Sequence, residues 1–355
     1  MPERLHPLLK PLLAEDWAAV DPALPGLLEL LFARSAAEDW HKAGTFRDHL
    51  LGVARTLTLW GQPREVVLLG LFHSVYSNEY VDLRLFDAAG ERAALSAALG
   101  GEAERLVHTF CAMPRTLFAR RLLEEGGLPE EGMVLEREGA PPILLSMRDV
   151  AVFAIATIAD IAEQWHSWQD EVFAGYPFQK TRPLRENWAA SLWPGPLKPT
   201  ATALSLLSRL ARPLSGMPEE WGLPTPPVFA RCTALLEPEE EMAALAFYWQ
   251  AVTRGLPQAG MAATHRALEA AARHNPYVGE PRLLLAQLAL TAGEWEMAAA
   301  HARAGLDLLS DWGVAWDKRV AWSGWVAWAR ILLQSAERRS WPETLPGLNG
   351  LGLVG

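Results

Sequence analysis

The chain has 355 residues, carries a net charge of −10 and is half apolar. This length allows two domains of ordinary size, and the composition is typical of a globular protein with a buried core. The acidic charge argues against binding of nucleic acid, because phosphate backbones are bound by clustered Lys and Arg. No run of residues is long and apolar enough for a membrane span, and the N-terminus lacks the pattern of a signal peptide. We therefore expect neither a nucleic-acid partner nor a membrane.

The chain contains only two cysteines, Cys111 and Cys232. A framework of disulfides is therefore excluded, and the cytoplasm is the expected location. Neither cysteine lies in a CxxC motif or beside a partner that would mark it as a nucleophile.

Helical periodicity dominates the chain, which predicts an all-α fold. The helix expected to start at Phe46 is preceded by Thr45 and has Asp48 three residues later, a pattern typical of a capping box. Pro63 is suited to open the next helix, because proline lacks the amide hydrogen that a first turn leaves unbonded. The pattern predicts helices over 27–36, 46–60, 64–75, 102–113, 115–125 and 146–173, with a loop at 126–132.

Prolines recur throughout residues 176–227, a density that does not support long helices. One helix is expected there, over 201–210, and the tryptophans of this stretch favour a packed connector. The predicted organisation is a helical domain at 1–175, the connector at 176–237, helical repeats at 238–340 and a flexible tail at 341–355.

The predicted C-terminal helices carry a weak repeat. Ala286, Gly293 and Ala298 have the spacing of the small residues at which the two helices of a tetratricopeptide unit meet, and Pro276 falls where a preceding unit would end. The segment resembles a short tetratricopeptide array. An ordinary helical bundle with alanines at its crossings is the alternative.

Three of the nine histidines, His41, His49 and His73, fall within one short stretch. Histidines on two neighbouring antiparallel helices can point into one cleft, and imidazole is a common ligand of divalent metals. His73 follows the apolar run VVLLGLF, where an unpaired imidazole would be unfavourable. Asp160 stands in a similarly apolar segment, and its spacing places it on one helix face with Asp149 and Glu163.

These residues carry a resemblance to a known superfamily. The segment DHLLGVARTL, a short turn and a segment ending in GLFHSVY are similar to the opening of HD-domain phosphohydrolases, and in particular to the hydrolase half of the stringent-response alarmone enzymes. The resemblance implies an HD-like helical bundle in which His49 and His73 are metal ligands and Asp160 is the distal aspartate. Asn78 and Glu79 would fall near the acidic positions that follow the second histidine.

The chain departs from the HD pattern at Ser74, which stands where the superfamily has the aspartate of its His-Asp pair. A neutral hydroxyl does not supply the anionic bridge that holds two metals. The sequence therefore predicts one Fe, Mn or Zn ion held by His49, His73 and Asp160, with His41 as a fourth candidate ligand. Residues 38–195 are also similar to bacterial proteins that contain the phrases DHLLGT and LFHSVYGTE, a resemblance that supplies no activity.

Other residues near the histidines are candidates for substrate binding or proton transfer. Tyr76 and Glu79 are the candidate acid and base. The candidate substrate-binding residues are the cations Lys42 and Arg47, suited to a phosphate, together with Ser74, Asn78 and Glu163.

Structural roles without a metal remain open for each of these positions. His49 and His73 could share a hydrogen bond, His41 could lie at the surface, and Asp160 could pair with Arg148 or Arg115.

Three functions follow from these observations. The first is a metal-dependent hydrolase of a phosphorylated or nucleotide-like small molecule. The second, a variant of the first, is an HD-like iron-dependent oxygenase. The third is a non-catalytic adaptor that binds a protein or peptide through its helical repeats.

Overall fold

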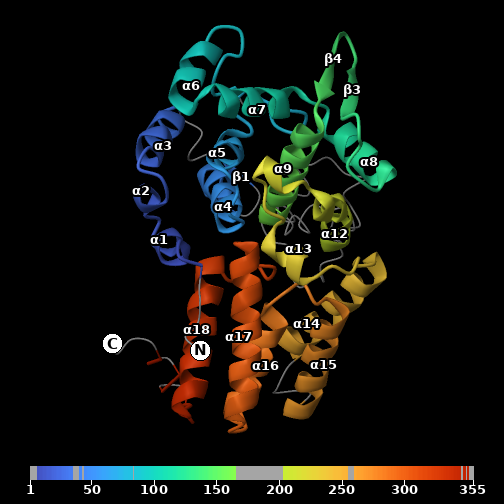
Figure 1. Cartoon of the computed structure of the whole chain (residues 1–355). Helices are drawn as coiled ribbons and strands as arrows, with labels where there is room; N and C mark the ends of the chain where they lie inside the picture. The colour runs from blue at the N-terminus through green and yellow to red at the C-terminus, as the bar shows by residue number, and fades with distance from the viewer. Residues whose placement is uncertain are drawn as a thin grey trace, which may run out of the picture. The chain divides into compact units, whose positions relative to one another are not determined.

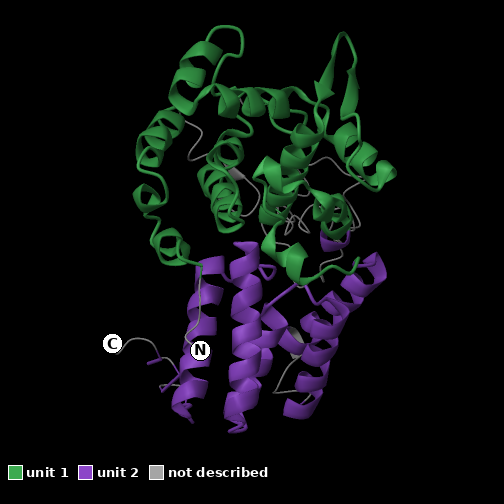
Figure 2. Cartoon of the chain, in the orientation of Figure 1, with its two compact units in different colours: residues 1–164, 206–235 green, residues 165–205, 236–355 purple. Residues whose placement is uncertain are grey.

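The computed structural model describes residues 6–34, 40–41, 44–82, 84–164, 203–254, 260–344, 347–348 and 350–351. The described chain is mostly helical, as predicted, with two short antiparallel hairpins (Figure 1). It forms two compact units, one of residues 1–164 and 206–235 and the other of residues 165–205 and 236–355 (Figure 2). The predicted connector is therefore divided between the units, and residues 165–202 lie outside the described part.

The first unit is built mainly from short and medium helices. Its elements up to the second hairpin are α1 (Leu9–Leu13), α2 (Trp17–Val20), α3 (Leu24–Phe32), β1 (Trp40–His41), β2 (Gly44–Thr45), α4 (Phe46–Leu59), α5 (Arg64–Phe72), α6 (Arg92–Leu99), α7 (Gly101–Ala112) and α8 (Arg115–Glu125). The remaining elements are β3 (Met133–Arg137), β4 (Ala140–Leu145), α9 (Met147–Gln164), the end of α12 (Ala203–Ala211), the 3-10 turns at Arg212–Gly216 and Glu219–Trp221, and α13 (Pro227–Arg231).

Helix α4 begins at the residue that the sequence predicts. The Asp48 amide donates to Thr45 Oγ1 and the Thr45 amide donates to Asp48 Oδ2, both at 3.1 Å, so the capping box is confirmed. Pro63 precedes the first residue of α5, as expected. Helix α9 covers the helix predicted over 146–173 as far as Gln164, and the predicted continuation lies outside the described residues.

The hairpin of β3 and β4 was not predicted. Its first strand alternates buried Met133 and Leu135 with Val134, which is 48% exposed, so the apolar pattern has the period of a strand. Gly139, with φ of +70°, lies in the turn between the strands, in a conformation that glycine adopts readily. The predicted loop at 126–132 ends where the strand begins.

The centre of the first unit is formed by α4, α5 and α9. Helix α9 is buried along almost its whole length, and it packs against α4 and α5. Two glycines allow this close packing. A Cβ at Gly70 would lie 2.3 Å from Cδ1 of Leu57 on α4, and one at Gly52 would lie 2.7 Å from Cγ of Glu163 on α9. Both contacts are too short for a larger residue unless the neighbour moves.

The second unit consists of the consecutive helices α14 (Pro238–Arg254), α15 (Met261–His274), α16 (Glu280–Thr291), α17 (Trp295–Trp312) and α18 (Trp322–Arg338). Each helix packs against the next one, and α16 also packs against α18. Ala286 and Ala298 are fully buried, and Gly293 forms the turn between α16 and α17 with φ of +76°. The positions singled out for small residues are thus packed tightly, while the tetratricopeptide identity stays a prediction.

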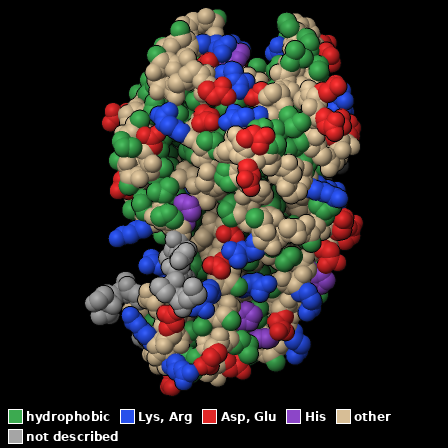
Figure 3. All heavy atoms as spheres, viewed as in Figure 1, with side chains coloured by type: hydrophobic (Ala, Val, Ile, Leu, Met, Phe, Trp, Pro, Cys, Tyr) green, Lys and Arg blue, Asp and Glu red, His purple; other side chains and the backbone are tan. Residues whose placement is uncertain are grey.

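Among the described helices, none has the length and hydropathy that crossing a bilayer requires. On the face drawn in Figure 3, acidic and basic side chains are interspersed with apolar ones.

Candidate metal centre

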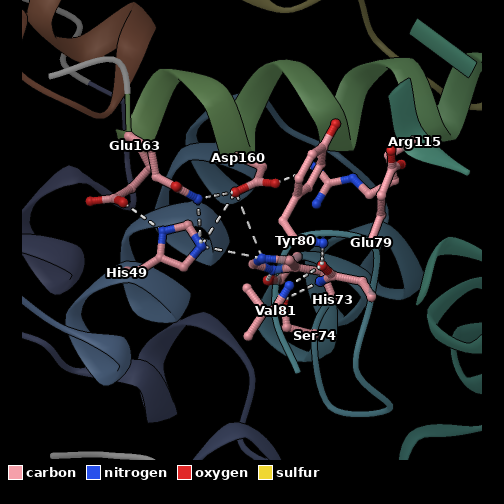
Figure 4. Close-up of polar contacts among 12 residues, drawn as sticks. His49, His73, Ser74, Glu79, Tyr80, Val81, Arg115, Asp160 and Glu163 are labelled. Atoms are coloured by element: carbon pink, nitrogen blue, oxygen red, sulfur yellow. Dashed lines mark hydrogen bonds and ion pairs between the residues drawn. The ribbon is translucent and has the colours of Figure 1, made fainter. Parts of the chain in front are cut away.

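Three buried side chains from three different elements meet in the centre of the first unit. His49 lies in the first turn of α4, His73 directly follows α5, and Asp160 lies in the last turns of α9. All three are less than 5% exposed. Figure 4 shows the two imidazoles below α9, with Asp160 directed toward both. The residues predicted to share a site are therefore brought together.

Three atoms of this cluster form a nearly regular triangle. His49 Nε2 lies 3.2 Å from His73 Nε2 and 3.3 Å from Asp160 Oδ1, and His73 Nε2 lies 3.7 Å from Asp160 Oδ1. The ligands of a tetrahedral ion with bonds of about 2.1 Å lie about 3.4 Å apart. One ion can therefore reach all three atoms without movement of the backbone, and the group could hold a metal ion.

The outer nitrogen of each imidazole is bound to an acceptor. His49 Nδ1 lies 2.6 Å from Glu163 Oε2, and His73 Nδ1 lies 2.7 Å from the carbonyl oxygen of Gly70. A carboxylate and a carbonyl accept hydrogen bonds only, so each Nδ1 carries the hydrogen and each Nε2 presents a lone pair to the centre. Metal-binding histidines are commonly oriented by such outer partners.

The centre of the cluster thus collects acceptors. Two Nε2 lone pairs and Asp160 Oδ1 face one another at distances of 3.2–3.7 Å, an arrangement that favours a cation between them, either a proton or a metal ion. Burial alone lowers the pKa of His49, but the carboxylates of Asp160 and Glu163 outweigh it and raise the pKa to about 9. Burial lowers the pKa of His73 to about 4, despite the opposing charge of Asp160. Without a metal, the proton of the cluster therefore resides on His49.

Arg115, the first residue of α8, occupies the other side of Asp160. Its Nη2 donates to Asp160 Oδ2, and its guanidinium lies 4.5 Å from the ring centre of Phe110 and 5.4 Å from that of Tyr80. Burial raises the pKa of Asp160, but the charge of Arg115 and the contacts with the two histidines hold it well below its ordinary value. The ion pair with Arg115, one of the structural roles considered for Asp160, is therefore present, and it leaves Oδ1 directed at the histidines.

Gln164, in the last turn of α9, closes the cluster. Its Nε2 lies 2.6 Å from Asp160 Oδ1 and 3.2 Å from His49 Nε2, so the amide contacts two of the atoms that an ion would bind. For an ion to enter, this side chain has to turn aside or present its oxygen in place of its nitrogen. Gln164 is therefore the residue whose rotation would open or close the centre.

The other residues predicted for the site lie around it with partners of their own. The side-chain amide of Asn78 donates to Ser74 Oγ at 3.0 Å, and the Glu79 carboxylate accepts from the backbone amide of Thr116 at 2.9 Å. The Tyr76 hydroxyl donates to Glu104 at 3.0 Å, and burial together with this carboxylate raises the pKa of Tyr76. These contacts direct the candidate acid and base, Tyr76 and Glu79, toward neighbours outside the triangle.

Of the predicted cations and the fourth candidate ligand, only Arg47 has a described side chain, and its contacts lie away from the triangle. Arg47 pairs with Glu15 at 3.3 Å and lies over the ring of Phe32. Lys42 and the side chain of His41 lie outside the described residues, although the backbone of His41 pairs with Gly44 in the first hairpin. Arg115, which pairs with Asp160, is a cation that contacts the cluster directly.

Comparison with known proteins identifies one family over part of the chain. Residues 30–115 match the model of a family described as Domain of unknown function (DUF6817). The matched segment contains His49, His73 and Arg115 and ends before Asp160. No curated protein and no solved structure matches the chain.

Sequence reasoning missed two features of the centre. The first is the contact of Gln164 with the triangle, although the glutamine follows Asp160 by four residues and so shares its helix face. The second is the role of Gly52 and Gly70. Each lies three residues from a histidine of the cluster, on the same face of its helix, and each permits the approach of the element that completes the site. A glycine one turn from each histidine was therefore the available signal.

Proposed function

We propose that the protein is a metal-dependent hydrolase with an HD-like site, acting on a phosphorylated or nucleotide-like small molecule. One observation carries the proposal: the Nδ1 atoms of His49 and His73 are both bound to acceptors, so two Nε2 lone pairs and Asp160 Oδ1 face a common point. Two imidazoles and one carboxylate suit a divalent Fe, Mn or Zn ion.

The residues of the chain would divide the work between them. When bound, a divalent ion acts as a Lewis acid and lowers the pKa of a water molecule toward neutrality. Glu163 and the Gly70 carbonyl hold the imidazoles in the required tautomer. Arg115 supplies positive charge beside Asp160, and its Nε has no hydrogen-bond partner in the described part of the chain. We therefore assign to Arg115, rather than to Lys42 or Arg47, the role of attracting a phosphate group.

The first test is the metal content of the full-length protein, purified without added metal. About one equivalent of iron, manganese or zinc is expected, with loss of the metal in His73→Ala. The matched control is His108→Ala, because His108 contacts the ring of Tyr76 and lies outside the triangle. A protein without metal, in which His73→Ala leaves the stability unchanged, would contradict the proposal.

The second test is metal-dependent release of phosphate from a panel of nucleotides and phosphate esters. The protein and the His108→Ala variant should release phosphate, while His73→Ala and chelator-treated protein should not. Retained metal with no release from any member of the panel would leave the metal centre in place and remove the hydrolase assignment.

A second candidate function is favoured by the ligand set itself. Two histidines and one carboxylate also form the set used by non-haem iron(II) oxygenases. In that case the bound metal would be iron, and the reduced protein would consume oxygen in the presence of substrate. Zinc or manganese as the sole bound metal would exclude this candidate.

The adaptor hypothesis is favoured by the contacts of Asp160, which Arg115 and Gln164 already satisfy in part. On that hypothesis, the cluster is structural and the helices of residues 238–338 bind a protein or peptide. On each of the three hypotheses we propose that the protein is cytoplasmic. The tetratricopeptide-like character of these helices is likewise part of the proposal. Absence of metal from the purified protein would favour this function over the other two.

A further inference from the structure

Gln164 contacts the triangle of His49, His73 and Asp160 from the last turn of α9. Asp160 and Gln164 are four residues apart, so they share one face of that helix. The three residues of the triangle are buried, whereas Gln164 is only partly buried. A partly exposed side chain changes rotamer more readily than a buried one, so Gln164 is the mobile member of the cluster.

In the metal-free protein, the amide of Gln164 presents its nitrogen to the triangle. Nε2 lies 2.6 Å from Asp160 Oδ1. A carboxylate oxygen only accepts hydrogen bonds, so the amide nitrogen faces it and the amide oxygen cannot. The orientation of the amide is therefore set by the carboxylate that an ion would bind.

A bound ion reverses this preference. The cation repels the hydrogens of an NH2 group and attracts a carbonyl oxygen, and amide oxygens of Gln and Asn are ligands of divalent metals. A turn of about 180° around the last side-chain bond exchanges the two atoms, and that torsion has only a broad preference of its own. The same side chain can thus serve the empty centre with its nitrogen and the loaded centre with its oxygen.

The place of the amide suits a fourth ligand. The four ligands of a tetrahedral ion lie about 3.4 Å from one another. The terminal atom of Gln164 already lies 3.2 Å from His49 Nε2, and its distance of 2.6 Å from Asp160 Oδ1 would have to lengthen to about 3.4 Å. A side-chain movement of about one ångström is therefore sufficient, and the backbone of α9 can stay in place.

We propose that Gln164 is the fourth protein ligand of the ion, and that its amide turns over when the metal binds and presents Oε1 to it. The inference rests on the metal-dependent function proposed above. Catalytic sites with three protein ligands keep the fourth position for water. In this protein the amide holds that position in the loaded resting state, so water or substrate must displace Gln164 before the reaction.

The first test is the zinc affinity of the full-length protein and two variants, measured against a competing chelator. Gln164→Leu keeps the approximate size of the side chain but has no ligand atom, so its zinc Kd should rise about tenfold. Gln164→Glu offers an anionic oxygen at the same place and should bind zinc about tenfold more tightly than the unmodified protein. Gln250→Leu, at an exposed glutamine of α14, is the matched control and should leave the affinity unchanged.

The second test counts the water molecules on the metal. The full-length protein is loaded with Mn²⁺, and the relaxation of water protons is measured. Gln164→Leu should hold about one more water than the unmodified protein, because water takes the place of Oε1. A glutamine that merely packs beside the site would not change this count.

The outcomes separate this inference from the function on which it rests. Zinc binding that Gln164→Leu strengthens or leaves unchanged, or an equal number of waters in the two proteins, overturns the role of Gln164 and leaves the metal centre in place. Absence of zinc binding by the unmodified protein overturns both. Should Gln164→Leu fail to fold, Gln164→Glu carries the test, and weaker zinc binding by that variant overturns the inference.

Discussion

The His49–His73–Asp160 cluster of the first unit and the Tyr248–Glu280–Asp317 cluster of the second unit both bury carboxylates, but different groups face those carboxylates. In the second unit, Asp317 accepts from the Tyr248 hydroxyl at 2.6 Å and from the guanidinium of Arg319, while Glu280 accepts from the amide of Trp316 at 2.6 Å. Donors and acceptors are matched. In the first unit, the inner atoms of the triangle are all acceptors.

This difference separates a structural cluster from a candidate ligand site. Tyr248, Arg319 and the backbone amides donate to the carboxylates of the second unit, so these carboxylates have donors within the chain itself. In the triangle, two imidazole nitrogens and a carboxylate oxygen face one another, and among the described residues Gln164 and a proton on His49 offset this convergence only in part. Burial of carboxylates therefore does not by itself indicate a functional site, whereas convergence of acceptors does.

The largest expected effect comes from removing the central carboxylate of each cluster in metal-free protein. Asp160→Ala leaves Arg115 charged and buried without its partner, and should lower the free energy of unfolding of the first unit by about 3–5 kcal/mol. Asp317→Ala should cost less, because the Arg319 side chain is 42% exposed and can be hydrated. Hydrogen exchange measured by mass spectrometry resolves the two units.

The control for Asp160→Ala is the double variant Asp160→Ala with Arg115→Leu, which removes both charges and should recover much of the lost stability. If Asp160→Ala alone costs less than Asp317→Ala, the assignment of the tighter ion pair to the first unit is wrong.

The second prediction concerns the pH dependence of the second unit. Burial raises the pKa of Glu280 from its ordinary value of 4.5 to about 7. The folded state therefore binds this proton more tightly than the unfolded state does. The stability of the second unit should fall by roughly 2–3 kcal/mol as the pH rises from about 4.5 to 7. Glu280→Gln, which keeps an oxygen acceptor for the amide of Trp316, should remove most of this slope, as measured by hydrogen exchange at several pH values.

A slope that persists unchanged in Glu280→Gln would show that another group titrates. The same measurement on peptides of the first unit is the internal control, since the substitution should not change their pH dependence.

The third prediction concerns the pH dependence of zinc binding in the first unit. The pKa of His49 is raised to about 9, so its proton stabilises the metal-free fold below pH 6.5 and this stabilisation is lost as the pH rises through 9. A metal ion must displace that proton, whereas His73, with a pKa of about 4, is already neutral. Zinc affinity should therefore rise about tenfold per pH unit between pH 6 and 8.

Calorimetry in two buffers of different ionisation enthalpy measures the protons released, and we expect about one per ion bound. Release of none would mean that His49 is not protonated in the metal-free protein. Release of two would mean that His73 also carries a proton, against the pKa direction that burial imposes on it.

Local signals in the sequence predicted much of what forms the site. The capping box at Thr45 and the proline before α5 fix where α4 and α5 begin, because they depend only on near neighbours in the chain. The convergence of His49 and His73 followed from their places on consecutive helices, and Asp160 was recognisable as an isolated acid in an apolar helix.

The remaining features depend on packing between distant segments. Arg115 and Arg148 were equal candidates as partners of Asp160, and only the fold decides between them, because it brings the first residue of α8 to Asp160 and pairs Arg148 with Glu65. The strands of the second hairpin were missed because their alternation covers few residues. The Gln62 side chain donates to the carbonyl oxygen of Pro224, far along the chain, and local patterns carry no information about such a contact.

The smallest expected effect tests how far the metal centre depends on the cap of its own helix. Thr45→Ala removes the hydroxyl that accepts from the Asp48 amide and should lower the stability of the first unit by about 1 kcal/mol. His49 lies one turn further along α4 and is also held by Glu163, so we expect zinc affinity to fall less than tenfold. Thr291→Ala is the matched control, because this threonine donates only to the carbonyl of Gln287 within α16. The loss of zinc-binding free energy in Thr45→Ala can be compared with its loss of unfolding free energy. If the first is larger, the first turn of α4, rather than the contact with Glu163, positions the imidazole of His49.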